Sequence, residues 1–107
     1  MGKREFIKII EDFAKNLSKD FNIKRVIFFG SRVSGKATED SDIDLIIVSD
    51  DFKGMGFFER GAMMYNYWKA LIPIDFLCYT EEEFDKLRKR ISIVSEAVNS
   101  GIVIETR

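Results

Sequence analysis

The sequence has no histidine, a single cysteine and a single proline. One cysteine, Cys78, cannot form a disulfide within the chain, and without histidine the chain lacks the mixed ligand set of a zinc site. Disulfide frameworks and zinc clusters are therefore excluded as sources of stability, and the chain must fold around an apolar core. Because scarce cysteine is typical of proteins in a reducing compartment, we expect a cytoplasmic location.

An excess of charge of one sign is also missing. The 17 Lys and Arg residues are balanced by 18 Asp and Glu residues, which gives a formal net charge of −1. Proteins that bind nucleic acid through its phosphates usually carry a basic excess, so we expect no direct nucleic-acid binding. No apolar run approaches the ~20 residues that cross a bilayer, and the first residues, MGKREF, lack the apolar core of a signal peptide. We therefore expect no membrane association.

Apolar residues, in contrast, are frequent, and they make up 46 % of the 107 positions. That content supports one core, and the length accommodates a single domain over residues 1–107. We expect Pro73 to end one helix and Gly101 to end another in the left-handed conformation. Periodicity predicts helices over 4–17, 57–71, 81–90 and 92–99, a turn or short helix over 31–36, polar loops over 39–41 and 49–56, and strands over 24–29, 42–48, 74–79 and 102–105. This order is typical of a small α/β domain.

Two carboxylates, Asp42 and Asp44, stand at the start of the strand expected over 42–48. Because side chains alternate along a strand, both acids lie on one face, about 7 Å apart at the backbone, and Ile43 lies on the other. Residues 45–48 are all apolar, which indicates a central strand. Two like charges at the end of a buried strand are unfavourable unless a cation joins them, and hard oxygen ligands suit Mg²⁺. Two such ions about 4 Å apart can hold the attacking and leaving oxygens of a phosphoryl displacement.

A third carboxylate, Asp75, lies near the start of the apolar strand expected over 74–79. An acid in that position is explained if the strand lies beside the other two acids, so that Asp75 shares a metal ion or accepts the proton of an attacking hydroxyl. Gly30 and Ser31 end an earlier strand, where a glycine lets the backbone approach a phosphate and a serine offers a hydroxyl and an N–H. The sequence therefore predicts a phosphate-binding turn next to a metal site.

The segment GSRVSGKATEDSDIDL, residues 30–45, resembles the signature of the nucleotidyltransferase superfamily, in which Gly-Ser precedes Asp-x-Asp at this spacing. That superfamily includes kanamycin nucleotidyltransferase and the repair DNA polymerases. The resemblance is greatest to the minimal nucleotidyltransferases, the antitoxin-like partners of HEPN proteins in bacteria and archaea. It extends over essentially the whole chain. Val33 departs from the pattern, since a small residue such as alanine is more usual there.

The resemblance implies an α/β (α+β) nucleotidyltransferase fold, with a mixed sheet of about four strands flanked by helices. It also implies two bound Mg²⁺ ions and a substrate that is ATP or another nucleoside triphosphate. A nucleoside monophosphate would be joined to a hydroxyl, and pyrophosphate would leave. The residues assigned to metal binding and catalysis are Asp42, Asp44 and Asp75, and those assigned to the triphosphate are Gly30, Ser31 and Arg32.

The expected function is transfer of AMP to a hydroxyl of a HEPN-type partner protein within a toxin–antitoxin pair. Two alternatives stay open: a non-catalytic antitoxin that acts by contact, and a transferase for a small molecule such as an aminoglycoside. The three acids favour an enzyme, because a contact role does not require them. Aromatic residues and methionines spread around the helix expected over 57–71, which predicts an exposed partner surface close to Asp44 and Asp75. Whether the chain forms a homo-oligomer is left open.

Overall fold

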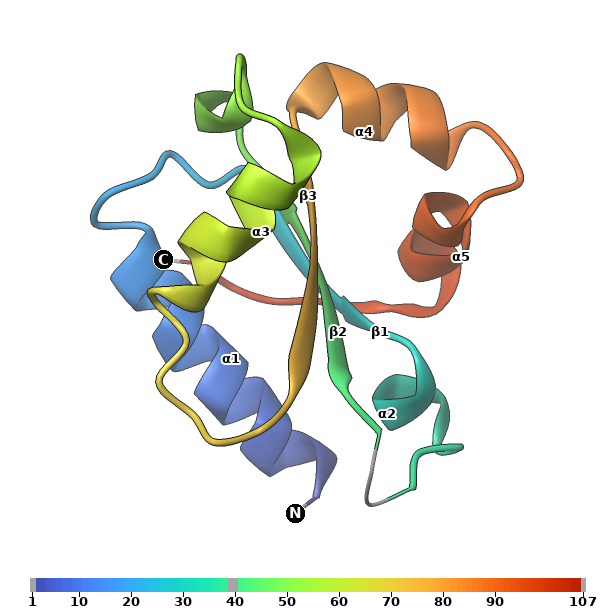
Figure 1. Cartoon of the computed structure of the whole chain (residues 1–107). Coiled ribbons are helices and arrows are strands. Elements are labelled where there is room, and N and C mark those ends of the chain that lie inside the picture. The colour runs from blue at the N-terminus through green and yellow to red at the C-terminus, as the bar shows by residue number, and fades with distance from the viewer. Residues whose placement is uncertain (1, 39–40, 107) are drawn as a thin grey trace.

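The structure is a computed structural model, which describes residues 2–38 and 41–106 (Figure 1). Two residues of the expected polar loop, Glu39 and Asp40, lie outside the described residues. The helices are α1 (Lys3–Leu17), α2 (Ser31–Ser34), α3 (Phe57–Tyr65), α4 (Glu81–Arg88) and α5 (Ile93–Ser100), with a 3₁₀ turn, η1, at Asp50–Phe52. The strands are β1 (Arg25–Phe29), β2 (Ile43–Val48), β3 (Ile74–Tyr79) and β4 (Ile102–Val103).

The strands form one mixed sheet in the order β3-β2-β1-β4. β2 pairs with β3 in parallel, whereas β1 runs antiparallel to both β2 and β4. β2 therefore has a neighbour on each side, which confirms that the strand following the paired acids is central. The mixed four-stranded sheet with its flanking helices confirms the expected α/β (α+β) class.

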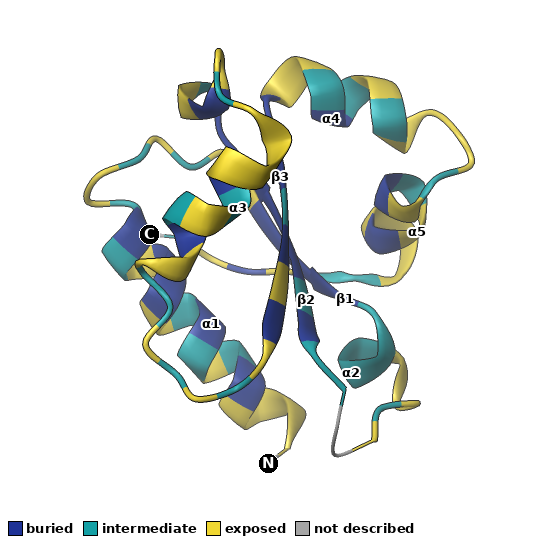
Figure 2. Ribbon diagram, in the orientation of Figure 1, coloured by how far each residue is buried: buried dark blue, intermediate teal, exposed yellow. Residues whose placement is uncertain are grey.

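Helices cover both faces of the sheet (Figure 1). On the face of α1 and α3, strand residues such as Phe28 and Leu45 belong to the larger buried cluster. On the face of α4 and α5, the alternate strand residues Ile27 and Ile46 form a second cluster with Phe84. Figure 2 shows that β1 and β2 are largely buried between these two layers, whereas β3, at the edge of the sheet, alternates between buried and more exposed residues. The alternation along each strand therefore fixes which layer any strand residue faces.

The third helix is shorter than expected: α3 ends at Tyr65, and Pro73 does not end it. The chain continues in tighter turns, in which the N–H groups of residues 66, 67 and 68 donate to the carbonyls three positions earlier. Side chains of this segment bond to the chain that leads into β3. The Tyr65 hydroxyl donates to the Ile74 carbonyl, and the Trp68 indole donates to the Ile72 carbonyl over 2.9 Å. Tertiary contacts therefore outweigh the helical periodicity of 66–71.

The prediction that Gly101 ends α5 in the left-handed conformation was wrong. Its φ and ψ are −82° and 173°, which is extended backbone. Glycine is needed there for space, because a Cβ would lie 2.4 Å from the Ala97 carbonyl oxygen and 2.7 Å from Cγ2 of Ile27. The close approach brings the end of α5 directly onto β1.

An arginine that is almost fully buried ties α3, β3 and α4 together. Arg60 forms a 2.6 Å ion pair with Glu83 and donates to the carbonyls of Cys78 and Met55. Glu83 also accepts from the N–H of Thr80 in the capping box that begins α4. Hydrogen bonding from Arg60 lowers the pKa of Glu83 below its usual range, although burial acts in the opposite direction.

The ion pair predicts an acid-dependent loss of stability that Glu83→Gln reduces. A carboxyl whose pKa is depressed by folding stabilises the protein above its ordinary value of 4.5, and this contribution is lost as the pH falls through the lowered value. Glutamine keeps the capping hydrogen bond but carries no charge. In urea unfolding at a series of acid pH values, we expect the free energy of unfolding to fall more steeply for the wild type than for the variant. Parallel pH curves would contradict this.

Candidate active site

The structure brings the three predicted acids together at one end of the sheet. Asp44 of β2 and Asp75 of β3 are register partners on parallel strands, so their side chains emerge on the same face from backbones about 4.8 Å apart. Ile43 is buried in the cluster beneath α1 and α3, which places Asp44 on the opposite face, that of α4 and α5. Asp42 directly precedes β2, one residue outside the strand in which it was expected.

Burial and mutual repulsion disturb these carboxyl groups. Burial, followed by the charges of Asp75 and Asp42, raises the pKa of Asp44. Burial, followed by the charge of Asp42 and hydrogen bonding with it, raises the pKa of Asp75. Both shifts have the direction expected for carboxylates that share a site without a counter-charge. The cluster therefore favours any cation that can lie among its oxygens.

The backbone of Gly30 lies directly against the Asp44 carboxylate. It follows β1 with a φ of +85°, a conformation that favours glycine. A Cβ at this position would lie 2.2 Å from Oδ2 of Asp44. The sequence predicts Gly30 from the needs of a bound phosphate, and the structure adds a second reason, which is room for the Asp44 carboxylate. Ser31 begins α2 immediately after this contact.

Arg32 lies in α2 and links that helix to the segment that enters β2. Its guanidinium donates to the Ser41 carbonyl from Nε over 3.1 Å and from Nη2 over 2.7 Å. The same group lies 4.8 Å from the centre of the Phe6 ring. Since Ser41 precedes Asp42, these contacts make Arg32 a positioning residue for the first acid. Its expected contact with a phosphate stays a prediction.

A cavity of about 460 Å³ opens beside Gly30, Ser31 and Asp44. Its volume lies within the range of roughly 300–1,000 Å³ that is typical of small-molecule sites. Its other walls come from α2 and, sixty residues further along the chain, from α5. The wall residues that sequence reasoning did not assign to the site are Phe29, Val33, Ser34, Lys36, Ile93, Glu96 and Ser100. No local pattern marks the three from α5, because only the fold brings that helix to the Gly-Ser turn.

The carboxylates of Asp42, Asp44 and Asp75 offer oxygen ligands for a metal ion, but they do not form a ready-made coordination site. Within residues 2–38 and 41–106, no group of three or more His, Cys, Asp or Glu side chains is already arranged to hold an ion. Carboxylates are nevertheless the ligands that Mg²⁺ prefers, and the repulsion among these three remains unrelieved. By charge and ligand chemistry, Asp42, Asp44 and Asp75 are therefore the residues that would hold a divalent cation.

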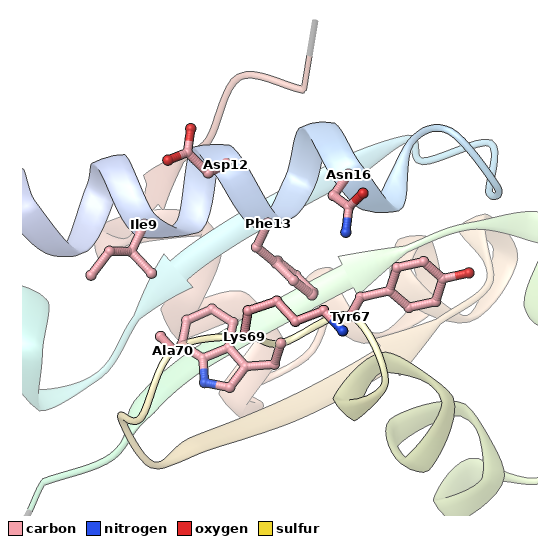
Figure 3. Close-up of a pocket in the computed structure, with 8 residues that line it drawn as sticks. Ile9, Asp12, Phe13, Asn16, Tyr67, Lys69 and Ala70 are labelled. Carbon is pink, nitrogen blue, oxygen red and sulfur yellow. The ribbon is translucent and has the colours of Figure 1, made fainter.

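A separate cavity of about 330 Å³ lies between α1 and residues 67–70 (Figure 3). Its lining includes Phe13 and Trp68, whose rings meet edge to face with centroids 5.4 Å apart. None of the three acids and neither residue of the Gly-Ser turn lines it. This cavity therefore does not belong to the candidate active site.

The start of α3 does not lie close to the acids, contrary to expectation. Phe57 packs against Tyr79 at the last position of β3, with ring centroids 6.1 Å apart, whereas Asp75 is near the first position of that strand. Phe57 and Phe58 are 45 % and 89 % exposed, as expected for part of this segment. Only the other end of α3, at Tyr65, reaches the acidic end of the sheet, through its bond to the Ile74 carbonyl. The exposed phenylalanines thus form a surface remote from the site.

Comparison with known proteins decides the family. The model of the nucleotidyltransferase domain family matches residues 7–100. The chain belongs to the nucleotidyltransferase domain family. Its resemblance to nucleotidyltransferases through residues 30–45 is thereby confirmed, and so is its assignment as a nucleotidyltransferase enzyme.

Individual relatives agree with this assignment. The chain is 29 % identical over 96 residues to the "probable protein adenylyltransferase MntA" of Haemophilus influenzae, a match that covers 86 % of this chain and 80 % of the relative. It is 30 % identical over 70 residues to the "protein adenylyltransferase MntA" of Thermococcus cleftensis, covering 65 % of this chain and 68 % of the relative. A crystal structure described as a putative nucleotidyltransferase of Sulfolobus solfataricus shares the fold, with a TM-score of 0.64, 24 % identity and coverage of 91 % of this chain and 77 % of that one.

No helix among the described residues is long and apolar enough to cross a membrane.

The contact between Gly30 and Asp44 predicts that Gly30→Ala destabilises the protein more than an ordinary positive-φ glycine substitution does. At Gly30, φ is +85° and ψ is −160°, a region that residues with a Cβ rarely occupy and that costs them about 1–3 kcal/mol. At Gly30 the new methyl group must also displace the Asp44 carboxylate. We expect urea unfolding to show a larger loss of stability in Gly30→Ala than in the matched control.

Gly54→Ala is that control, because Gly54 has a φ of +81° and no atom within 4 Å of the position of its Cβ. Adding Asp44→Ala to Gly30→Ala should then recover part of the excess loss, since the obstructing carboxylate is removed. Equal losses at the two glycines, or no recovery in the double variant, would show that the contact with Asp44 has no energetic weight.

Proposed function

We propose that this protein is a magnesium-dependent nucleotidyltransferase that transfers AMP from ATP to a hydroxyl of a partner protein. The observation that carries the proposal is the register pairing of Asp44 with Asp75 beside the backbone of Gly30. That arrangement sets a candidate metal site beside a candidate triphosphate site, and Asp44 lines the same cavity as Gly30 and Ser31. The names of the MntA relatives support AMP as the transferred group and protein as the acceptor.

In this proposal Asp42, Asp44 and Asp75 hold Mg²⁺, which supplies positive charge that neutralises the triphosphate when bound. Gly30 and Ser31 bind the phosphates that leave as pyrophosphate. The acceptor oxygen forms a bond to the α-phosphorus while the bond from that phosphorus to the pyrophosphate oxygen breaks. Asp75, the most exposed of the three acids, accepts the hydroxyl proton.

We infer that the partner is a HEPN-type protein, that the acceptor is a tyrosine hydroxyl and that the pair acts in the cytoplasm as a toxin–antitoxin system. Positioning dominates phosphoryl transfer, so the acceptor hydroxyl must be held beside the acids, and a partner protein that binds this domain can hold it there. An exposed apolar surface, which is typical of protein contacts, is present at Phe57 and Phe58.

A second function, neutralisation of the partner by contact alone, is favoured by one observation. The exposed pair Phe57 and Phe58 lies at the end of β3 away from Asp75, so binding through this surface does not require the acids. The two functions make different predictions for the mass of the partner.

The test is co-expression of the chain with its genomic neighbour, followed by purification and intact mass spectrometry of that neighbour with ATP and Mg²⁺. We expect a mass gain of one or more AMP units, because the acids support transfer. Asp44→Asn should abolish the gain, since it removes a charge at nearly constant volume. Asp85→Asn is the matched control, because Asp85 pairs with Arg88 on the exposed side of α4.

A stable complex without added mass would overturn transfer and support the contact function. Transfer that survives Asp44→Asn would overturn the assigned metal site. If no complex forms, the protein-partner proposal fails, and transfer to a small molecule becomes the remaining activity to assay.

A further inference from the structure

The cavity beside the Gly-Ser turn has one wall that the proposed chemistry does not use. Figure 1 shows α2 and α5 on the same side of the sheet, and the cavity of about 460 Å³ is lined by both helices. On α5, Ile93, Glu96 and Ser100 line it. Their spacing of three and four residues places them on one stripe of the helix.

This stripe is held in a fixed position. The neighbouring stripe of α5 packs into the core through Val94 and Ala97, which are 0 % and 1 % exposed. Gly101 then lets the end of the helix approach β1 more closely than a residue with a Cβ allows. α5 therefore presents Ile93 and Glu96 to the cavity from a rigid support.

The chemistry of the α5 wall differs from that of the opposite wall. Gly30, Ser31 and Lys36 offer a close backbone approach, a hydroxyl and a positive charge, which suit phosphate. Ile93 offers an apolar side chain that is 51 % exposed, and Glu96 offers a negative charge that repels phosphate. Among the described residues, no side chain forms an ion pair with Glu96.

We propose that α5 forms the nucleoside subsite of this enzyme, where Ile93 packs against the nucleoside and the Glu96 carboxylate accepts hydrogen bonds from the ribose hydroxyls. This inference rests on the proposed function and adds the substrate contact that the acids and the Gly-Ser turn cannot provide. The α-phosphate is bonded directly to the ribose, so a phosphate at Asp44 brings the sugar into the same cavity. A carboxylate is an acceptor for vicinal hydroxyls, and an exposed aliphatic side chain gains by covering apolar surface.

The test measures binding of three ligands to the purified chain by calorimetry in Mg²⁺: ATP, 2′,3′-dideoxy-ATP and inorganic tripolyphosphate. The wild type should bind ATP about tenfold more tightly than dideoxy-ATP, as expected for a hydrogen bond to a charged group. Glu96→Gln should reduce this preference for ATP over dideoxy-ATP, because a neutral amide oxygen is a weaker acceptor than a carboxylate, whereas loss of the charge that repels phosphate acts on both nucleotides alike. Ile93→Ala should weaken both nucleotides and leave tripolyphosphate unchanged.

Glu82→Gln is the matched control, because Glu82 is an exposed acid on α4 that pairs with Lys86 away from the cavity. It should leave the affinity for all three ligands unchanged. Thermal unfolding of each variant checks that the substitutions leave the fold intact.

A Glu96→Gln variant that keeps the full wild-type preference for ATP over dideoxy-ATP would overturn the subsite, because the carboxylate would then make no contact with the ribose hydroxyls. Equal binding of ATP and dideoxy-ATP by the wild type would overturn the role of Glu96. Either result leaves the proposed transferase standing. If the wild type binds neither ATP nor tripolyphosphate, the proposed function itself fails, and the subsite fails with it.

Discussion

Repulsion among three carboxylates is the constraint around which the acidic end of the sheet is organised. Parallel pairing of β2 and β3 sets Asp44 opposite Asp75, and the chain entering β2 adds Asp42. Burial first, and then the neighbouring carboxylates, raise the pKa values of Asp44 and Asp75. Three carboxylates in one place reduce the stability of a small domain unless a bound cation relieves their repulsion. A divalent cation with a triphosphate matches both the charge and the oxygen ligands.

The elements around the acids leave a cavity beside Asp44. Gly30 leaves room for the Asp44 carboxylate where any Cβ would collide with it. Arg32 holds the Ser41 carbonyl and thereby the approach to the first acid. Opposite Gly30, α5 packs closely on β1 at Gly101, so that a helix rather than a loop lines that side of the cavity. Two glycines thus make room at the site: Gly30 for the Asp44 carboxylate, and Gly101 for the close packing of α5 on β1.

The sequence predicts those parts of the molecule that depend on neighbours in the chain. Alternation and apolar runs locate all four strands, and the spacing of Gly30, Asp42 and Asp44 indicates the chemistry before any fold is known. Among features set by distant contacts, the placement of Asp75 beside Asp44 is predicted, because a lone acid in an apolar strand calls for a neighbouring site, but two others are not. α3 ends at Tyr65 because its aromatic side chains bond to residues before and within β3. The contribution of Ile93 and Glu96 depends on how α5 crosses the sheet, for which their own segment carries no signal.

The most direct test of the central claim is the free energy of unfolding of the wild type and of Asp44→Asn, measured in urea with EDTA and again with increasing Mg²⁺. The account predicts that without metal the variant is as stable as the wild type or more stable, since one repulsive charge is gone. It predicts that Mg²⁺ stabilises the wild type by binding the folded state and stabilises the variant much less. A variant that is less stable in EDTA, or an equal response of both proteins to Mg²⁺, would contradict the assignment of these acids as a metal site.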